Sequence, residues 1–180
     1  MHLGSLVTAG SAALAAAAAT PEQIVTGINS LTEKMAALQA PAQSITVVNA
    51  PLLLIGQGPF PQIIAGFQDI ANSANALTAE IGTQGESKEG ATVATSFRDF
   101  VRVSQATLNI LIGKAGILQK VPVVGEPVAS SLRSVEGAVD TLAITLINIF
   151  KSVSEDLEND SSSLGSTLDI TIQKYESLQA

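Results

Sequence analysis

The sequence predicts an all-α fold: a single bundle of five or six antiparallel helices around an elongated apolar cavity. Apolar residues recur at steps of three and four in several long segments, which is the spacing of a helix face packed against other helices. No segment shows the sustained two-residue alternation that is typical of a half-buried strand. Hydrophobic residues make up 46% of the 180 positions, ample material for the core of one domain.

The predicted bundle is organised around a helix over residues 127–159, whose apolar positions keep the helical spacing throughout. The stretch from Leu142 to Phe150 is apolar on almost every side. Such a helix is either surrounded by neighbours or forms the wall of an apolar cavity. This run of nine residues is far shorter than the roughly 20 needed to cross a bilayer, so we expect no stable membrane insertion.

Residues 1–19 are predicted to be a leader or an expression linker, because their alanine-rich run follows no basic region. The helical domain is predicted to cover residues 20–180. It begins with a hydroxyl cap at Thr20, a proline at the first helical position, and Gln23, which can complete a capping box. The first helix then runs to about Leu38 and is interrupted at Pro41.

The segment 49–61 is expected to be a loop, because its glycines and prolines are unfavourable for regular structure, and Phe60 is its expected buried anchor. We expect this loop to act as a lid. Further helices are predicted over residues 63–81 and about 91–120. The serine-rich run at 160–163 should break the chain before a last helix that starts with a capping box at Ser166.

Charge and composition exclude several classes of function. Net charge is −7 without any cluster of Lys and Arg, so nucleic acid is not an expected partner. There is no cysteine, and the only histidine is His2, which leaves serine without a catalytic partner. Charged residues amount to 14%, below the ~25% of ordinary proteins and similar to many secreted and wall-attached proteins. We therefore expect a non-enzyme that needs no metal or cofactor.

Two further features bear on function. Large rings are scarce, with no Trp, one Tyr and five Phe, so the interior consists of aliphatic side chains, which suit an acyl chain as well as an ordinary core. Several predicted helices contain glycines, which either make close helix contacts or line a cavity: Gly27, Gly66, Gly113, Gly116 and Gly137.

Four stretches carry a resemblance to a known family: Thr20–Ile24 with the apolar face that continues to Leu38, Phe97–Phe100, Val123–Val128 and Leu157–Leu168. On these stretches, residues 20–180 resemble the fungal hydrophobic surface-binding protein A and the related ligand-binding domains of cell-wall galactomannoprotein antigens. The resemblance implies a helical bundle that encloses a long-chain fatty acid, arachidonic acid in the best-known case. It also implies a secreted or cell-wall mannoprotein, a fungal antigen and virulence factor that sequesters host lipid.

A long-chain fatty acid is therefore the expected partner of a monomeric, lipid-binding domain. Each buried methylene contributes ~0.8 kcal/mol, so the acyl chain supplies most of the affinity. No Lys or Arg lies in the apolar stripes, so we expect neutral donors for the carboxylate, with Ser104, Gln105 and Ser166 as candidates. The candidate ligand-binding residues are Phe67, Phe97, Val101, Ser104, Gln105, Leu108, Leu142, Leu146, Ile149 and Ser166.

Two other functions remain open from the sequence. One is an adhesion module that spreads its apolar helix faces on hydrophobic surfaces. The other is a structural bundle that buries the same apolar stripes between subunits and needs no ligand.

Overall fold

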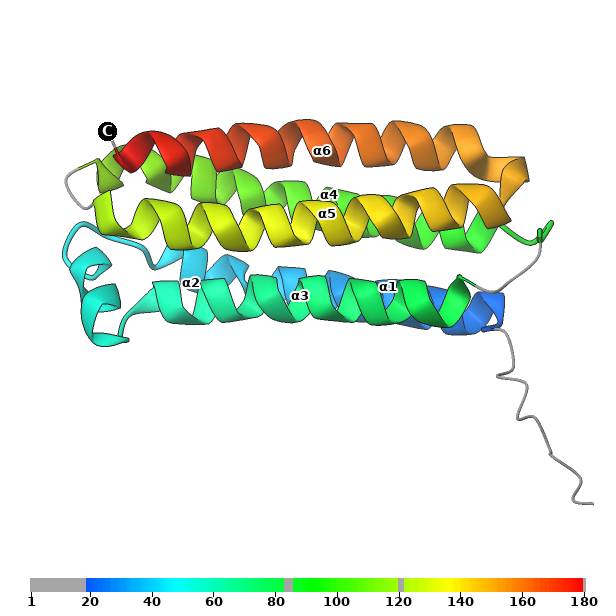
Figure 1. Ribbon diagram of the computed structural model, residues 1–180, viewed down its shortest axis with the longest axis horizontal. Helices are drawn as coiled ribbons and strands as arrows, with labels where there is room; N and C mark the ends of the chain where they lie inside the picture. The colour runs from blue at the N-terminus through cyan, green and yellow to red at the C-terminus, as the bar shows by residue number, and fades with distance from the viewer. Residues whose placement is uncertain (1–18, 83–85, 120–121, 180) are drawn as a thin grey trace, which may run out of the picture.

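The computed structural model describes residues 19–82, 86–119 and 122–179. Five long helices lie along one axis of an elongated bundle (Figure 1): α1 Pro21–Ala37, α3 Pro59–Ile81, α4 Ala91–Ala115, α5 Gly125–Ile149 and α6 Ser154–Glu176. A short α2, Gln39–Gln43, and five 3-10 turns connect or follow them: η1 Ala50–Ile55, η2 Gly116–Leu118, η3 Pro122–Val124, η4 Lys151–Val153 and η5 Ser177–Gln179. The described residues contain no strand, and the all-α prediction is confirmed.

The five long helices form a ring. Each packs mainly against two others, in the order α1, α4, α6, α5, α3 and back to α1. Consecutive long helices run in opposite directions, as predicted, but α1, α4 and α6 all run the same way (Figure 1). The neighbouring pairs α1–α4, α4–α6 and α3–α5 are therefore parallel. Because every helix turns its apolar stripe toward the same interior, one core extends along the bundle.

The beginning of α1 follows its sequence signature. The backbone N–H of Gln23 donates to Thr20 Oγ1 at 3.3 Å, and the backbone N–H of Thr20 donates to Gln23 Oε1 at 2.7 Å. Each residue thereby satisfies a backbone group that the helix itself leaves free. The predicted capping box is confirmed.

The connection between α2 and α3 is more regular than predicted. Residues Ala50–Ile55 form η1, and α3 already begins at Pro59, inside the segment that we expected to be irregular. Prolines are compatible with the first helical turn, where the N–H has no partner in the helix. Gly58 precedes α3 with φ 81°, a conformation that favours glycine. Phe60 is fully buried, as predicted.

The prediction of one helix over residues 127–159 was wrong. Helix α5 ends at Ile149, because Phe150 leaves the helical conformation with φ −105° and ψ 63°. After η4, α6 continues unbroken through the serine run at 160–163, so the expected capping box at Ser166 lies inside a helix. Apolar spacing continues across the turn at Phe150 without any glycine or proline to mark it.

Helix α5 is not apolar on all sides in the folded chain. Leu142, Leu146 and Ile149 are buried, but Asn148 is exposed and the side chain of Ile144 is 59% exposed. The helix is therefore one wall of the bundle and not its enclosed centre. The largest fully buried side chains come from all parts of the ring: Tyr175, Phe60, Phe67, Phe97, Phe100, Phe150, Ile24, Ile28, Leu31, Met35, Ile45 and Ile63.

Within the described part of the chain, no single helix combines the length and hydropathy needed to span a membrane. Helix α5 and the segment Lys151–Glu176 meet the criterion only as a pair, and the two are bent by 110°.

The glycines fall into two groups with different roles. A Cβ added at Gly66 would lie 2.4 Å from Leu38 Cδ2, and one at Gly27 would lie 2.6 Å from Leu77 Cδ1. These two glycines give α1 and α3 a close, reciprocal contact. A Cβ added at Gly113, Gly116 or Gly137 would meet nothing within 4 Å, and all three are exposed, so they make no close helix contact. Gly113 and Gly116 line a surface pocket of about 260 Å³ beside Lys174.

Alanine substitutions should separate these two groups. We expect Gly66→Ala to lower the free energy of unfolding, because the crowding of buried Leu38 costs ~1 to 3 kcal/mol and exceeds the gain in helix propensity. Gly137→Ala is the matched control and should raise it by ~1 kcal/mol. Urea unfolding of both variants measures this. Stabilisation by Gly66→Ala would contradict the close contact.

Candidate functional site

Most of the residues predicted to contact a ligand lie in the shared interior. They come from three helices on different sides of the ring, α3, α4 and α5. All have at most 4% of their surface exposed: Phe67, Phe97, Val101, Ser104, Leu108, Leu142, Leu146 and Ile149. The fold therefore brings them to one apolar interior, although they are distant in the sequence.

Ser104 is the unusual member of this set. Its side chain is fully buried on α4, and its Oγ has no hydrogen-bond partner. A buried hydroxyl without a partner costs roughly 1 to 3 kcal/mol, so most such groups in native proteins are paired. Of the buried side-chain polar atoms in the described residues, Ser104 Oγ is the unpaired one.

Several other buried hydroxyl groups are paired with backbone carbonyls. Thr107 Oγ1 donates to the carbonyl of Met35 at 3.1 Å or to that of Val103 at 3.0 Å, and Ser131 Oγ donates to Val128. The Tyr175 hydroxyl donates to Leu111 at 3.1 Å, and burial raises the pKa of this phenol far above its ordinary value. These hydroxyls stabilise helix contacts and are not free to bind a ligand.

Two candidates for the carboxylate, Gln105 and Ser166, lie outside the interior. Gln105 Nε2 donates to Ser163 Oγ at 2.9 Å and to Thr167 Oγ1 at 3.2 Å, so it joins α4 to α6. Ser166 is exposed, and its Oγ donates to the carbonyl of Ser162. Both residues lie beside the apolar stripes in the sequence, a position that is compatible with the interior or with the outside of the bundle. In the structure both side chains form hydrogen bonds, Gln105 between helices and Ser166 within its own helix.

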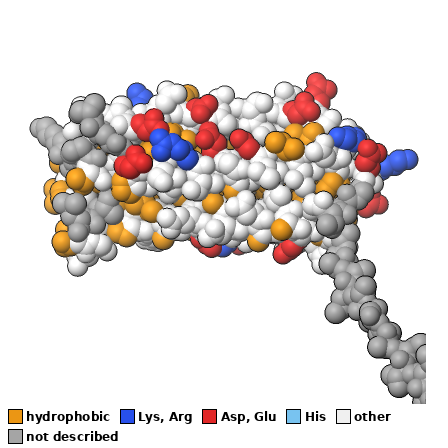
Figure 2. Space-filling model, viewed as in Figure 1, with side chains coloured by type: hydrophobic (Ala, Val, Ile, Leu, Met, Phe, Trp, Pro, Cys, Tyr) orange, Lys and Arg blue, Asp and Glu red, His pale blue; other side chains and the backbone are white. Residues whose placement is uncertain are grey.

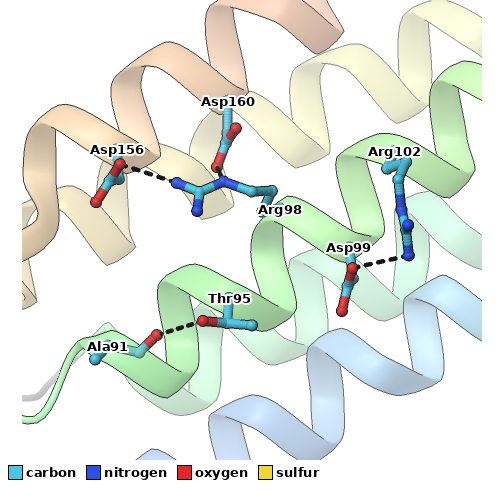
Figure 3. A network of polar contacts seen from close by, with 7 residues as sticks. All are labelled: Ala91, Thr95, Arg98, Asp99, Arg102, Asp156 and Asp160. Atoms are coloured by element: carbon cyan, nitrogen blue, oxygen red, sulfur yellow. Dashed lines mark hydrogen bonds and ion pairs between the residues drawn. The ribbon is translucent and has the colours of Figure 1, made fainter.

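Polar contacts between α4 and α6, which we call the polar seam, extend from Gln105 to a charged contact of Arg98 near the start of α4 (Figure 3). Arg98 reaches across to α6, where it donates to Asp156 Oδ1 at 2.9 Å and to Asp160 Oδ2 at 3.2 Å. Burial raises the pKa of Asp160, while the Arg98 guanidinium opposes this shift. Such exposed ion pairs contribute little stability each, but together with Gln105 they fix the register of α4 on α6.

An open cleft between the first turns of α1 and α4 was not predicted. Its volume is about 590 Å³, within the range of small-molecule sites. It is lined by Pro21, Glu22, Val25, Thr26, Lys88, Glu89, Ala91 and Thr92, and a smaller hollow beside it extends to Thr95 and Ser96. A single sequence does not show which helices are neighbours, so it could not predict that these residues lie together. The cleft places Lys88 beside the first turn of α1.

Three carboxyl groups gather between α5 and α6. Burial raises the pKa of Glu136, and the charge of Asp169, a hydrogen bond with Asp169 and the charge of Asp140 raise it further, while Arg133 lowers it. Burial and then Asp169 also raise the pKa of Asp140. No group of three or more His, Asp or Glu among the described residues could hold a metal ion. We therefore interpret this cluster as a source of electrostatic strain, caused by burial and by repulsion between the carboxyl groups, and not as a metal site.

This strain predicts how stability depends on pH. A carboxyl group with a raised pKa in the folded state binds protons more tightly when folded, so its stabilising contribution is complete below its unfolded pKa and is lost as pH rises through the folded value. For Glu136 the ordinary value is 4.5. Glu136→Gln should therefore raise the free energy of unfolding at pH 7 and have a smaller effect near pH 4.5.

Urea unfolding at the two pH values measures the effect, with Glu33→Gln on the exposed face of α1 as the control. An equal effect of Glu136→Gln at both pH values would refute the electrostatic assignment.

The fold is similar to two solved structures from Penicillium marneffei. One is ligand binding domain 2 of the MP1 protein complexed with multiple arachidonic acids, at a TM-score of 0.67 and 12% identity, covering 86% of this chain and 92% of that domain. The other is ligand binding domain 1 of the same protein complexed with arachidonic acids, at a TM-score of 0.65 and 18% identity, covering 84% and 98%. At these identities the likeness shows a shared helical fold.

Sequence comparison gives no family assignment. No protein-family model matches the chain, and no curated protein matches its sequence significantly. The structural comparison is thus the one that places the chain: it shares the fold of the two MP1 ligand-binding domains.

Proposed function

We propose that this protein binds a long-chain fatty acid in the interior of its helical ring without acting on it chemically. The observation that supports this proposal is the buried, unpaired Ser104 Oγ in a mainly apolar interior. A carboxylate that accepts a hydrogen bond from this hydroxyl would remove its unfavourable burial. The two solved structures with the same fold are complexes with arachidonic acid, which supports this choice of ligand.

The dimensions and chemistry of the interior suit an acyl chain. Helices α4 and α5 each contain 25 residues, or ~37 Å at 1.5 Å per residue, which accommodates the length of an extended fatty acid. The walls consist mainly of Leu, Ile, Val and Phe side chains, and glycines make close contacts between α1 and α3 and, through Gly90, between the start of α4 and the α5–α6 turn. Small side-chain shifts are needed to admit the acyl chain. Each methylene transferred from water contributes ~0.8 kcal/mol, which offsets the free-energy cost of these shifts.

We further propose that the protein acts as a monomer outside the cell, secreted or in the fungal cell wall, where it sequesters lipid as a virulence-type mannoprotein. This proposal extends the family resemblance of the sequence and the fold likeness to the MP1 domains. Fractionation of the producing cells tests it, since we expect the protein in the medium or the wall fraction.

Burial favours this function over an adhesion module built on helix faces. Such a module needs contiguous apolar surface on its helices, whereas the apolar stripes of the five long helices face the shared core. The large hydrophobic side chains exposed on the described long helices are Ile144 and Ile170. The same burial within one chain leaves little apolar helix surface for a structural bundle formed between subunits.

Substitution of Ser104 tests the proposed carboxylate contact. Ser104→Ala removes a hydroxyl that has no partner, so the ligand-free protein should keep its stability. Its affinity for oleate or arachidonate should fall roughly 10- to 100-fold, because a hydrogen bond to a charged group contributes ~1.5 to 3 kcal/mol. The measurement is a titration of delipidated protein, with the fatty-acid methyl ester as a ligand that should show a much smaller difference.

Thr107→Val provides the matched control. It removes a buried hydroxyl on the same helix that is already paired, so it should lower stability by ~1 kcal/mol and leave affinity unchanged. If Ser104→Ala binds fatty acid as tightly as the wild type, the carboxylate contact lies elsewhere.

A larger side chain at Leu146 tests whether the ligand lies along α5. Leu146 is fully buried on the inner face of this helix. If the acyl chain passes beside it, the indole of Leu146→Trp occupies ligand space, so affinity should fall at least tenfold with little loss of ligand-free stability. If Leu146 belongs only to a closed core, overpacking should cost ~1 to 3 kcal/mol of stability and leave affinity unchanged. Melting curves and titrations of delipidated protein distinguish the two.

A further inference from the structure

The two ends of the bundle differ in chemistry. At one end, the α3–α4 connection is fixed to the α5–α6 turn, where the backbone N–H of Ser87 donates to the carbonyl of Ile149 at 2.9 Å and Gly90 lies against Phe150 and Val153. Charged residues are frequent in these segments: Glu86, Lys88, Glu89, Lys151, Glu155 and Asp156. The opposite end contains the α2–α3 connection, and the sequence from Met35 to Gln68 has no charged residue.

Exposed aliphatic side chains gather at this uncharged end. Val48 is 87% exposed and Ile55 is 66% exposed. Figure 1 places the α2–α3 connection at the end of the bundle where α6 finishes, and Figure 2 shows hydrophobic side chains gathered there. We define the apolar end by its exposed side chains, four from the α2–α3 connection and one from η3, which contacts η1: Val47, Val48, Leu52, Ile55 and Val123.

The connection satisfies many of its own polar backbone groups. The N–H of Thr46 donates to Asn49 Oδ1 at 2.8 Å, the N–H of Asn49 donates to Thr46 Oγ1 at 3.2 Å, and Asn49 Nδ2 donates to the carbonyl of Ser44 at 2.7 Å. The N–H groups of Ala50, Leu52 and Gln57 also donate to carbonyls within the connection. Internal pairing of this kind is what a segment needs before it can leave water for a lipid surface.

Among the described residues, the charges at the apolar end lie on the neighbouring helix ends and not on the α2–α3 connection: Glu126 in the first turn of α5, and Lys174 and Glu176 in the last turn of α6. Lys114 approaches the connection from α4, but its ammonium donates to the carbonyls of Gln43 at 2.7 Å and Ile45 at 3.0 Å. An open cleft of about 590 Å³ beside the connection is lined by uncharged residues, among them Ala37, Ser44 and Pro59. Protein interfaces usually contain aromatic or arginine anchors, whereas the exposed side chains here are all aliphatic.

We infer that the apolar end docks the protein onto the surface of a zwitterionic lipid layer, from which fatty acid passes into the bundle. The uncharged α2–α3 connection matches a surface without net charge, while the net charge of −7 on the whole chain is repelled by anionic lipid. Ile45, Ala50, Phe60 and Val124 are buried beneath the exposed side chains and continue into the core. The docking surface therefore lies directly over one end of the interior. Only the transfer of fatty acid rests on the proposed function.

The test uses the full chain and vesicles of phosphatidylcholine. The double variant Val48→Asp/Ile55→Asp places two charges at the apolar end, so its co-flotation with vesicles should fall at least about tenfold. Ile144→Asp is the control, because it places a charge on an exposed aliphatic side chain near the other end of α5, and it should float like the wild type. Replacing part of the phosphatidylcholine by phosphatidylglycerol should weaken flotation of the wild type.

The readouts separate docking from fatty-acid binding. Both variants should keep the wild-type melting temperature and the wild-type affinity for oleate in solution, whereas the double variant should take up oleate from vesicles more slowly. Wild-type flotation that the double variant retains would overturn the docking surface. A wild-type dimer that the double variant abolishes, without flotation, would replace it with an interface between copies. If the wild type floats but binds no oleate in solution, the docking surface stands and the proposed function fails.

Discussion

Five helices bury their apolar faces against one shared interior, and the rest of the structure depends on keeping that interior free of water. Each helix has two main neighbours, so no helix is enclosed and each retains an outer polar face. The polar seam between α4 and α6, from Arg98 to Gln105, and the glycine contacts between α1 and α3 keep the ring closed on its outside. The proposed function requires that this ring admit an acyl chain along its axis.

The interior also explains why one serine stands out. Many hydroxyl groups of the described helices donate to carbonyls of their own or a neighbouring helix, as those of Thr107 and Thr171 do. Ser104 does not, and it lies among Phe97, Val101 and Leu108. Without a ligand this hydroxyl is unfavourable, and a carboxylate beside it would convert it into a favourable contact. The same residue therefore links the energetics of the fold to the proposed binding of fatty acid.

The sequence predicted the features that depend on local chemistry and missed those that depend on neighbours. The Thr20–Gln23 capping box and the apolar stripe of α3 are local, and both were predicted correctly. The turn at Phe150 has no local signal, and the serines at 160–163 stay helical because α6 packs on α4 and α5. Gln105 directly follows Ser104, but consecutive residues of a helix point in different directions. Gln105 therefore lies in the polar seam and not in the interior. Neither the α1–α4 cleft nor the apolar end was visible without the arrangement of helices.

The most direct test of the interior as a fatty-acid site is native mass spectrometry of the delipidated protein with added arachidonate. The account predicts that the folded monomer gains the mass of one or more arachidonate molecules at a defined stoichiometry, and that Ser104→Ala gains it only at higher ligand concentration. A folded wild-type protein that remains free of ligand at saturating arachidonate would contradict it.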